Sequence, residues 1–274
     1  MNRKLLTALL ALCAALCLLP ALALAEGAAD VTIDPTNFPD ANFRTYVSTF
    51  DTDNDDRLTP TELAEVKDMT LISKSIGDLT GIEHFTALTK LLCQKNQLTS
   101  LDLSKNTALE ELDCGDNQLT SLDVSANTAL TSLLCGENQL TSLDVSKNTA
   151  LTSLRCAKNQ LASLDVSKNT ALEDLDFRWN QLTSLDVSKN AALKDLDCRW
   201  NQLTSLDLSA NPELSFSHCS PNHNTYRLTL DASRILDLTT LPGSFDVTKA
   251  SYWSGGTVVG TVLTVDGDAE QVTY

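Results

Sequence analysis

The sequence predicts an α+β repeat protein, a solenoid of about seven coils with parallel strands, between a short helical N-terminal cap and a small β C-terminal cap. The main observation is a 21-residue period in which three residue types recur at fixed phases. One asparagine column is Asn96, Asn117, Asn138, Asn159, Asn180 and Asn201, and a second is Asn106, Asn127, Asn148, Asn169, Asn190 and Asn211. The cysteine column is Cys93, Cys114, Cys135, Cys156 and Cys198, with Phe177 in the missing place. A unit this short cannot bury a core alone, so successive units must stack.

Residues 1–25 have the features of a secretory signal peptide, which predicts a secreted or cell-surface protein. Two basic residues precede an apolar run, Leu5–Leu19, and residues 23–25 form an A-x-A cleavage site. Pro20 breaks the apolar run, which favours a cleaved signal over a membrane anchor. We therefore expect no transmembrane segment in the mature chain.

The charge balance argues against nucleic acid and anionic membrane surfaces as partners. The full chain carries a net charge of −16, and cleavage would leave 18 basic residues against 36 acidic ones, a net charge of about −18. Such a chain is repelled by nucleic acid and by anionic membrane surfaces. It suits cations, basic partners or neutral glycans.

The mature part holds six cysteines, an even number that in a secreted chain normally indicates disulfides. Here all six share one phase, since Cys219 follows Cys198 by 21 residues. Neighbouring coils would bring them to about 4.8 Å, within disulfide range, but with both side chains pointing into the core side by side. This favours six buried free thiols over disulfides.

Residues 26–70 are expected to form the helical cap. Phe43, Tyr46, Val47 and Phe50 follow the i, i+3, i+4, i+7 spacing of one apolar helix face, and Asp40 is a suitable N-cap.

An acidic loop, residues 51–62, follows this helix. Its oxygen donors fall at the positions that a calcium loop uses, namely Asp51, Asp53, Asp55, the Arg57 carbonyl, Thr59 and Glu62. The segment resembles the loop of an EF-hand, which implies a structural calcium ion as cofactor. It departs from that pattern at Asp56, where glycine normally makes the turn, although aspartate tolerates the left-handed conformation. The alternative is that Thr59, Pro60 and Glu62 only cap the next helix and that the acids are a solvated turn.

Residues 71–222 form the predicted array. Leu109, Leu112, Cys114, Asn117 and Leu119 fit L-x-x-L-x-C-x-x-N-x-L, and a similar half-repeat follows directly. The period-2 alternation predicts a short strand with Leu and Cys inward. The pattern resembles the short nested leucine-rich repeats of secreted or surface proteins of bacteria. That resemblance implies a non-enzymatic recognition protein, with a protein or glycan bound on the concave face.

Two polar columns have structural explanations. Buried asparagine at each turn can satisfy backbone groups of adjacent coils, which an apolar residue cannot do. Asp102, Asp123, Asp144, Asp165, Asp186 and Asp207 would stack at coil spacing, at a cost in like-charge repulsion. We expect hydrogen bonds from the following turn to relieve it.

The outward positions change character late in the array, where two consecutive coils repeat D-x-D-x-R-W. The candidate ligand-binding residues are Asp174, Asp176, Arg178, Trp179, Asp195, Asp197, Arg199 and Trp200. Tryptophan and arginine dominate binding hot spots, and tryptophan also stacks on sugars. The alternative is duplication of one coil, with arginine and aspartate paired in a solvated ladder.

Residues 223–274 are expected to form a β cap or the start of a β domain. Residues 226–231, 244–253 and 256–267 each read as strands between glycine-rich breaks. A cap would cover the open edge of the array.

The sequence thus leaves two functional hypotheses: a recognition protein, or a structural spacer or display module of the bacterial surface without a specific ligand. An enzyme is not expected, because the array supplies no nucleophile–base pair.

Overall fold

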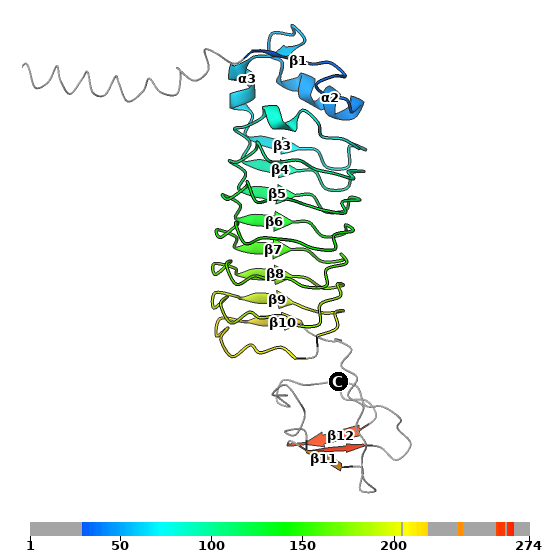
Figure 1. Cartoon of the computed structure of the whole chain (residues 1–274), viewed down its shortest axis with the longest axis vertical. Helices are drawn as coiled ribbons and strands as arrows, with labels where there is room; N and C mark the ends of the chain where they lie inside the picture. Colours follow the sequence, from blue (N-terminus) through cyan, green and yellow to red (C-terminus); the bar gives the residue numbers. More distant parts are fainter. Residues whose placement is uncertain (1–28, 204, 219–234, 238–255, 261, 266–274) are drawn as a thin grey trace, which may run out of the picture.

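The computed structural model describes residues 29–203, 205–218, 235–237, 256–260 and 262–265. The predicted signal peptide and Cys219 lie outside these residues. Figure 1 shows a stack of coils, one strand in each, with helices covering the N-terminal end of the stack. The fold is therefore the parallel-strand solenoid that the 21-residue period predicts.

The cap contains two short helices and a two-stranded ribbon. Helix α2, Ala41–Val47, begins at Asp40, whose side chain accepts hydrogen bonds from the backbone of Asn42 and Phe43, and it continues as the 3-10 turn η1, Ser48–Phe50. Helix α3, Pro60–Glu65, begins with a capping box between Thr59 and Glu62. Strand β1, Val31–Thr32, pairs antiparallel with β2, Arg57–Leu58, in the acidic loop. The N-terminal segment, through the pairing of β1 with β2, therefore holds this loop against the cap.

Eight strands form one parallel sheet in chain order. They are β3 Asp68–Thr70, β4 Lys90–Leu92, β5 Glu111–Asp113, β6 Ser132–Leu134, β7 Ser153–Arg155, β8 Asp174–Asp176, β9 Asp195–Asp197 and β10 Phe216–His218. From β4 to β10 each residue pairs with the residue 21 positions further on, as Leu112 does with Leu133. The first strand precedes residue 71 and lies in the segment that the sequence assigned to the cap. A 3-10 turn, η2 Ile82–His84, lies between β3 and β4.

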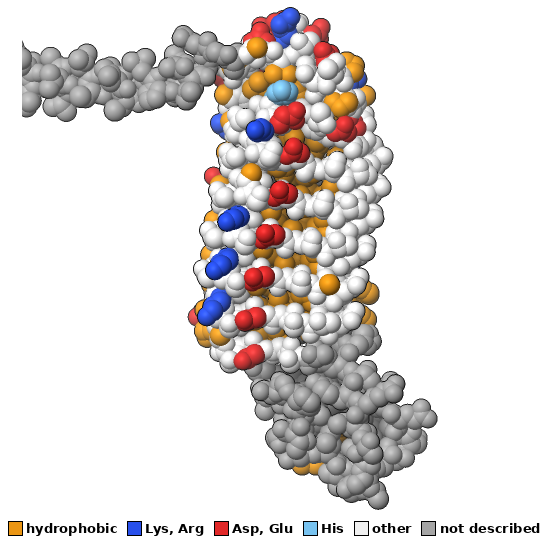
Figure 2. Space-filling model, viewed as in Figure 1, with side chains coloured by type: hydrophobic (Ala, Val, Ile, Leu, Met, Phe, Trp, Pro, Cys, Tyr) orange, Lys and Arg blue, Asp and Glu red, His pale blue; other side chains and the backbone are white. Residues whose placement is uncertain are grey.

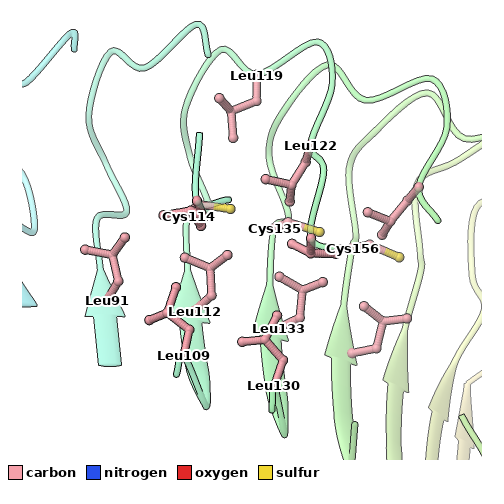
Figure 3. Close-up of a cluster of buried hydrophobic side chains, with 14 of the residues drawn as sticks. Leu91, Leu109, Leu112, Cys114, Leu119, Leu122, Leu130, Leu133, Cys135 and Cys156 are labelled. Atoms are coloured by element: carbon pink, nitrogen blue, oxygen red, sulfur yellow. The ribbon is translucent and has the colours of Figure 1, made fainter. Parts of the chain in front are cut away.

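The interior is filled by leucine columns and the cysteine column. Figure 3 shows Cys114, Cys135 and Cys156 in successive coils, with Leu112 and Leu133 beside them. Cys93, Cys114, Cys135 and Cys156 are buried free thiols. The prediction of six free thiols is wrong at Cys198, which is disulfide-bonded. The side-by-side argument holds for an uninterrupted run of coils, and Cys198 lies where the repeat is close to its end.

The asparagine columns connect each coil to the one before it. Asn138 Nδ2 donates to the carbonyls of Cys114 and Cys135, and its Oδ1 accepts from the Leu119 amide. Asn148, in the second column, donates to the carbonyls of Val124 and Asn127, but its Oδ1 has no partner among the described residues. Both columns thus satisfy backbone groups as predicted, and the first does so more completely.

The aspartate column forms local turns. Asp123 Oδ1 accepts from the Ser125 amide at 2.9 Å, and the other five aspartates make the equivalent bond. Hydrogen bonds from Ser125 lower the pKa of Asp123. Figure 2 shows a line of acidic side chains along one face of the array. Backbone hydrogen bonding therefore compensates the predicted repulsion.

Three further strands form a small antiparallel sheet in the order β11, β13, β12. They are β11 Ile235–Asp237, β12 Gly256–Val259 and β13 Val262–Val265. The strand predicted over residues 256–267 is a hairpin, because Gly260 turns the chain with φ 64°. The strands predicted at 226–231 and 244–253 lie outside the described residues.

Candidate functional site

The arginines of the D-x-D-x-R-W coils are held by aspartates. Arg199 binds the Asp197 carboxylate through Nε, at 2.9 Å, and through Nη2. Arg178 lies 3.6 Å from Asp176 and 3.3 Å from Asp197. Burial would raise the pKa of Asp197, but hydrogen bonds from Arg199 and Arg178 outweigh it and lower that pKa. Burial raises the pKa of Asp176, which has the longer arginine contact.

The charged ladder extends into the preceding coil. Arg155 contacts Asp174 Oδ2 through Nε and Nη2, both at 2.7 Å, and the Ser153 hydroxyl donates to the same oxygen. The sequence did not single out Arg155 and Ser153. Their positions in β7, one coil before Asp176 and Asp174 in register, are the signal that could have found them.

The carboxylate of Asp195 differs from its neighbours. Asp195 is exposed and forms no ion pair or hydrogen bond through its side chain with the residues that the structure describes. It lies directly opposite Asp174 in the β8–β9 register. Two carboxylates at this spacing repel each other. Of these two opposed carboxylates, Asp174 is therefore paired with Arg155, and Asp195 is unpaired among the described residues.

Trp179 and Trp200 occupy a column whose backbone is left-handed in six consecutive coils. The residues of this column are Lys95, Asp116, Glu137, Lys158, Trp179 and Trp200, with φ between 53° and 59°. Because Lys and acidic residues adopt the same φ, the turn before each first-column asparagine imposes it. The conformation costs a side-chain-bearing residue about 1–2 kcal/mol. The sequence did not predict this feature of the two tryptophans.

The two indoles, the Trp pair, stack on each other. Their ring centroids lie 4.5 Å apart and their planes differ by 13°. The separation is close to the spacing of neighbouring strands, about 4.8 Å, so the rings lie across the array axis. Trp179 is 48% exposed and Trp200 is 39% exposed. The two inner faces thus cover one another, and a large part of each ring remains exposed.

In the acidic loop, Asp51, Asp53 and Asp55 converge. Each offers a carboxylate oxygen within 4.8 Å of the others. The loop makes its turns at Asn54 and Asp56, with φ 60° and 61°, so aspartate does adopt the conformation usually given to glycine. Partial desolvation and repulsion from Asp55 raise the pKa of Asp53. This set of hard oxygen donors fits a calcium ion.

Glu62, Thr59 and Arg57, which belong to the same predicted ligand set, form hydrogen bonds within the loop. Glu62 Oε1 accepts from the amide and hydroxyl of Thr52, and Oε2 accepts from the amide and hydroxyl of Thr59. These bonds lower the pKa of Glu62 to about 2. The Arg57 amide donates to Asp55 Oδ1. Of the predicted ligands, the structure groups the carboxylates of Asp51, Asp53 and Asp55, and it holds the Glu62 carboxylate in hydrogen bonds with Thr52 and Thr59.

Comparison with known proteins identifies the array. The family described as leucine-rich repeats (two copies) matches residues 86–127. The chain therefore contains leucine-rich repeats. Internalin J of Listeria monocytogenes serotype 4b (strain F2365) is 44% identical over 70 residues, which is 25% of this chain and 8% of that protein.

Solved leucine-rich repeat structures share the fold. The crystal structure of an internalin, InlF, from Listeria monocytogenes superposes with a TM-score of 0.63 at 24% identity, covering 69% of this chain and 58% of that one. Internalin C2 from the same species gives a TM-score of 0.63 at 21% identity, covering 74% and 98%. The chain thus matches only part of the internalin J and InlF chains, and these similarities establish its architecture.

The described residues include no helix with the length and apolar character needed to cross a membrane.

Proposed function

We propose that this leucine-rich repeat protein is a secreted or cell-surface, non-enzymatic recognition protein that binds another protein through the concave face, with the Trp pair as anchor. The observation that carries the proposal is the exposed indole stack on coils whose arginines are already paired. The two large apolar rings restrict each other by stacking. Binding a partner therefore costs little conformational freedom of these two side chains. The internalin relatives and the secretory features of residues 1–25 support the location.

The orientation of the rings favours a protein over a glycan. Sugars bind tryptophan across the ring face, and the stack covers one face of each indole, which reduces the ring face open to a sugar. The ring edges carry the positive part of the ring quadrupole and suit carbonyl oxygens and aromatic faces, and the apolar rings suit aliphatic side chains. Those groups are abundant on protein surfaces.

The second candidate function is a spacer or display module without a specific ligand. The ion-pair ladder alone would fit that function, because paired arginine and aspartate need no partner. The Trp pair favours recognition, since exposed tryptophan at a left-handed position contributes little to the coil itself.

The test is binding by the mature chain to protein and glycan arrays. In the Trp179→Asn/Trp200→Asn variant the new residues tolerate positive φ, so the melting temperature should stay within a few degrees. Protein binding should fall at least about 100-fold, the size of a hot-spot loss of two anchors. The matched control, Glu137→Asn/Lys158→Asn, changes the same column two coils earlier and should keep full affinity.

A wild-type chain that binds nothing on either array would refute recognition and favour the spacer. Binding confined to glycans would overturn the choice of a protein partner. Binding that survives the double tryptophan change would move the site elsewhere on the array.

We also propose a structural calcium ion held by Asp51, Asp53 and Asp55, with water completing its coordination. The ion would offset the repulsion among three carboxylates in the segment that joins α2 to α3. At free calcium 100 times the Kd, the unfolding free energy should rise by about 2.7 kcal/mol. The measurement is thermal unfolding in calcium and in EDTA, with Asp53→Asn/Asp55→Asn as the site variant.

The control for charge is Asp123→Asn/Asp144→Asn, which removes the same number of acids from the array. It should preserve the calcium effect, whereas the site variant should abolish it. Equal melting temperatures of the wild type in calcium and EDTA would exclude a structural ion.

A further inference from the structure

The charged residues beside the Trp pair indicate which charge a partner should carry. This step rests on the proposed function, because it concerns what binds beside the same two indoles. The outward positions of β8 and β9 supply four aspartates, Asp174, Asp176, Asp195 and Asp197, and each strand is followed by one arginine of the ladder. How these charges are paired decides which sign remains available to a ligand.

The arginines are already bound. Arg199 forms two bonds to the Asp197 carboxylate, and Arg178 lies between Asp176 and Asp197. Asp176 and Asp197 are only 14% and 10% exposed in their side chains. An acidic partner would have to break these pairs to reach a guanidinium. These four paired residues, the inner row, therefore offer a ligand little free charge of either sign.

The outer row, the acidic pair Asp174 and Asp195, is neutralised only in part, because one arginine, Arg155, faces two carboxylates. Arg155 and Ser153 bind only one oxygen of Asp174, Oδ2, and no hydrogen bond to its Oδ1 is present among the described residues. Asp195 has a favourable Coulombic interaction with Arg155 but forms no ion pair in the described part of the chain. The strands place the two carboxylates opposite each other on adjacent coils. A cation between them would remove a like-charge repulsion that the free protein retains.

We infer that the partner is a protein segment that presents a Lys or Arg side chain to Asp174 and Asp195 and apolar groups to the Trp pair. A guanidinium fork or an ammonium group fits two carboxylate oxygens at neighbouring-strand spacing. The net charge of −16 draws such a segment toward the chain from a distance.

The strand sets the length of the segment. Trp200 follows Asp195 by five residues, of which only Asp195–Asp197 are strand, so the two contacts lie at most roughly 16 Å apart at about 3.3 Å per residue. An extended peptide spans that distance in about five residues. The partner's basic and apolar groups should therefore lie no more than about five residues apart in an extended segment.

The experiment is selection of a random 12-residue display library on the mature chain, followed by affinity measurement with the synthetic peptides. Enriched peptides should combine aromatic or aliphatic residues with Lys or Arg at the stated spacing. The array provides matched variants, because Ser132 and Ser153 occupy the position of Asp174 and Asp195 in earlier coils. Asp174→Ser/Asp195→Ser should weaken such a peptide about tenfold, and replacement of its basic residue by Gln should do the same.

The two changes should not add, since they remove one interaction. Higher salt should slow association of the wild type more than that of the Asp174→Ser/Asp195→Ser variant.

The outcomes separate the inference from the proposed function. Peptides that need Trp179 and Trp200 but carry neutral or acidic residues would overturn the basic partner and leave protein recognition standing. The same holds if the serine variant binds the basic peptides as tightly as the wild type. If no selected peptide needs the tryptophans, both ideas fail together.

Discussion

Replacing Asn138 by alanine should cost about 3 kcal/mol of unfolding free energy. The side chain is 8% exposed, and its three shortest hydrogen bonds join other coils and its own, beside a longer one to the Gly136 carbonyl at 3.2 Å. Nδ2 donates to Cys114 O at 3.0 Å and to Cys135 O at 3.1 Å, and Oδ1 accepts from Leu119 N at 2.9 Å. Each bond contributes about 1 kcal/mol, and alanine leaves the backbone partners buried without it.

Asn148→Ala gives the comparison that makes the reasoning testable. Its Nδ2 donates to Val124 O and Asn127 O, both at 2.9 Å. Losing these bonds should cost about 2 kcal/mol. The same change removes a buried amide oxygen that has no partner in the described structure, which returns about 1 kcal/mol. The net loss should be about 1 kcal/mol.

The assay is guanidinium unfolding at equilibrium of both variants. Exposed Gln139→Ala serves as a control, because only its backbone bonds to a neighbouring coil. Each coil contacts only its neighbours, so one substitution acts locally and the two losses can be compared. Asn138→Ala should be less stable than Asn148→Ala by about 2 kcal/mol. Equal losses, or a larger loss for Asn148→Ala, would refute the assignment of unequal hydrogen bonding to the two columns.

Two further predictions concern titratable groups. Cys93, Cys114, Cys135 and Cys156 should resist a thiol reagent until the protein is denatured, since burial raises the pKa of Cys114 and Cys156 to about 12. Cys198 should react only after reduction, and rapid labelling of the native chain would contradict this. The pKa of Glu62 is lowered from 4.5 to about 2, so its stabilisation is present above pH 4.5 and lost as the pH falls toward 2. Glu62→Gln should flatten urea stability across that window, and an unchanged slope would contradict the assignment.

The repeating features could be predicted from the sequence because every coil has the same surroundings. Asn138 and Asp123 each have one explanation that serves the whole column, and the pattern carries it. The exceptions depend on context that a period does not contain. The disulfide at Cys198 depends on how the array ends.

The site shows the same division. The sequence located Trp179 and Trp200, but their stacking depends on the left-handed turn that precedes each asparagine. Arg155 joins the ladder only through register with Asp176 and contact with Asp174, which requires strand pairing. In the acidic loop, the sequence allows Glu62 two roles, and its hydrogen bonds with Thr52 and Thr59 depend on a side-chain placement that the spacing alone does not specify.

The constant register has a consequence for how such a chain can change length. Because Leu112, Leu133 and their equivalents pair with a fixed offset of 21 residues, removing one whole unit joins two coils that already fit each other. Nearly identical segments such as residues 119–129 and 140–150, which begin 21 residues apart, are suited to misaligned genetic recombination, which deletes or adds whole 21-residue units in frame. Each such event would move the Trp pair by about 4.8 Å relative to the cap and leave its own surroundings intact. The height at which the recognition surface stands could thus vary between lineages independently of what it binds.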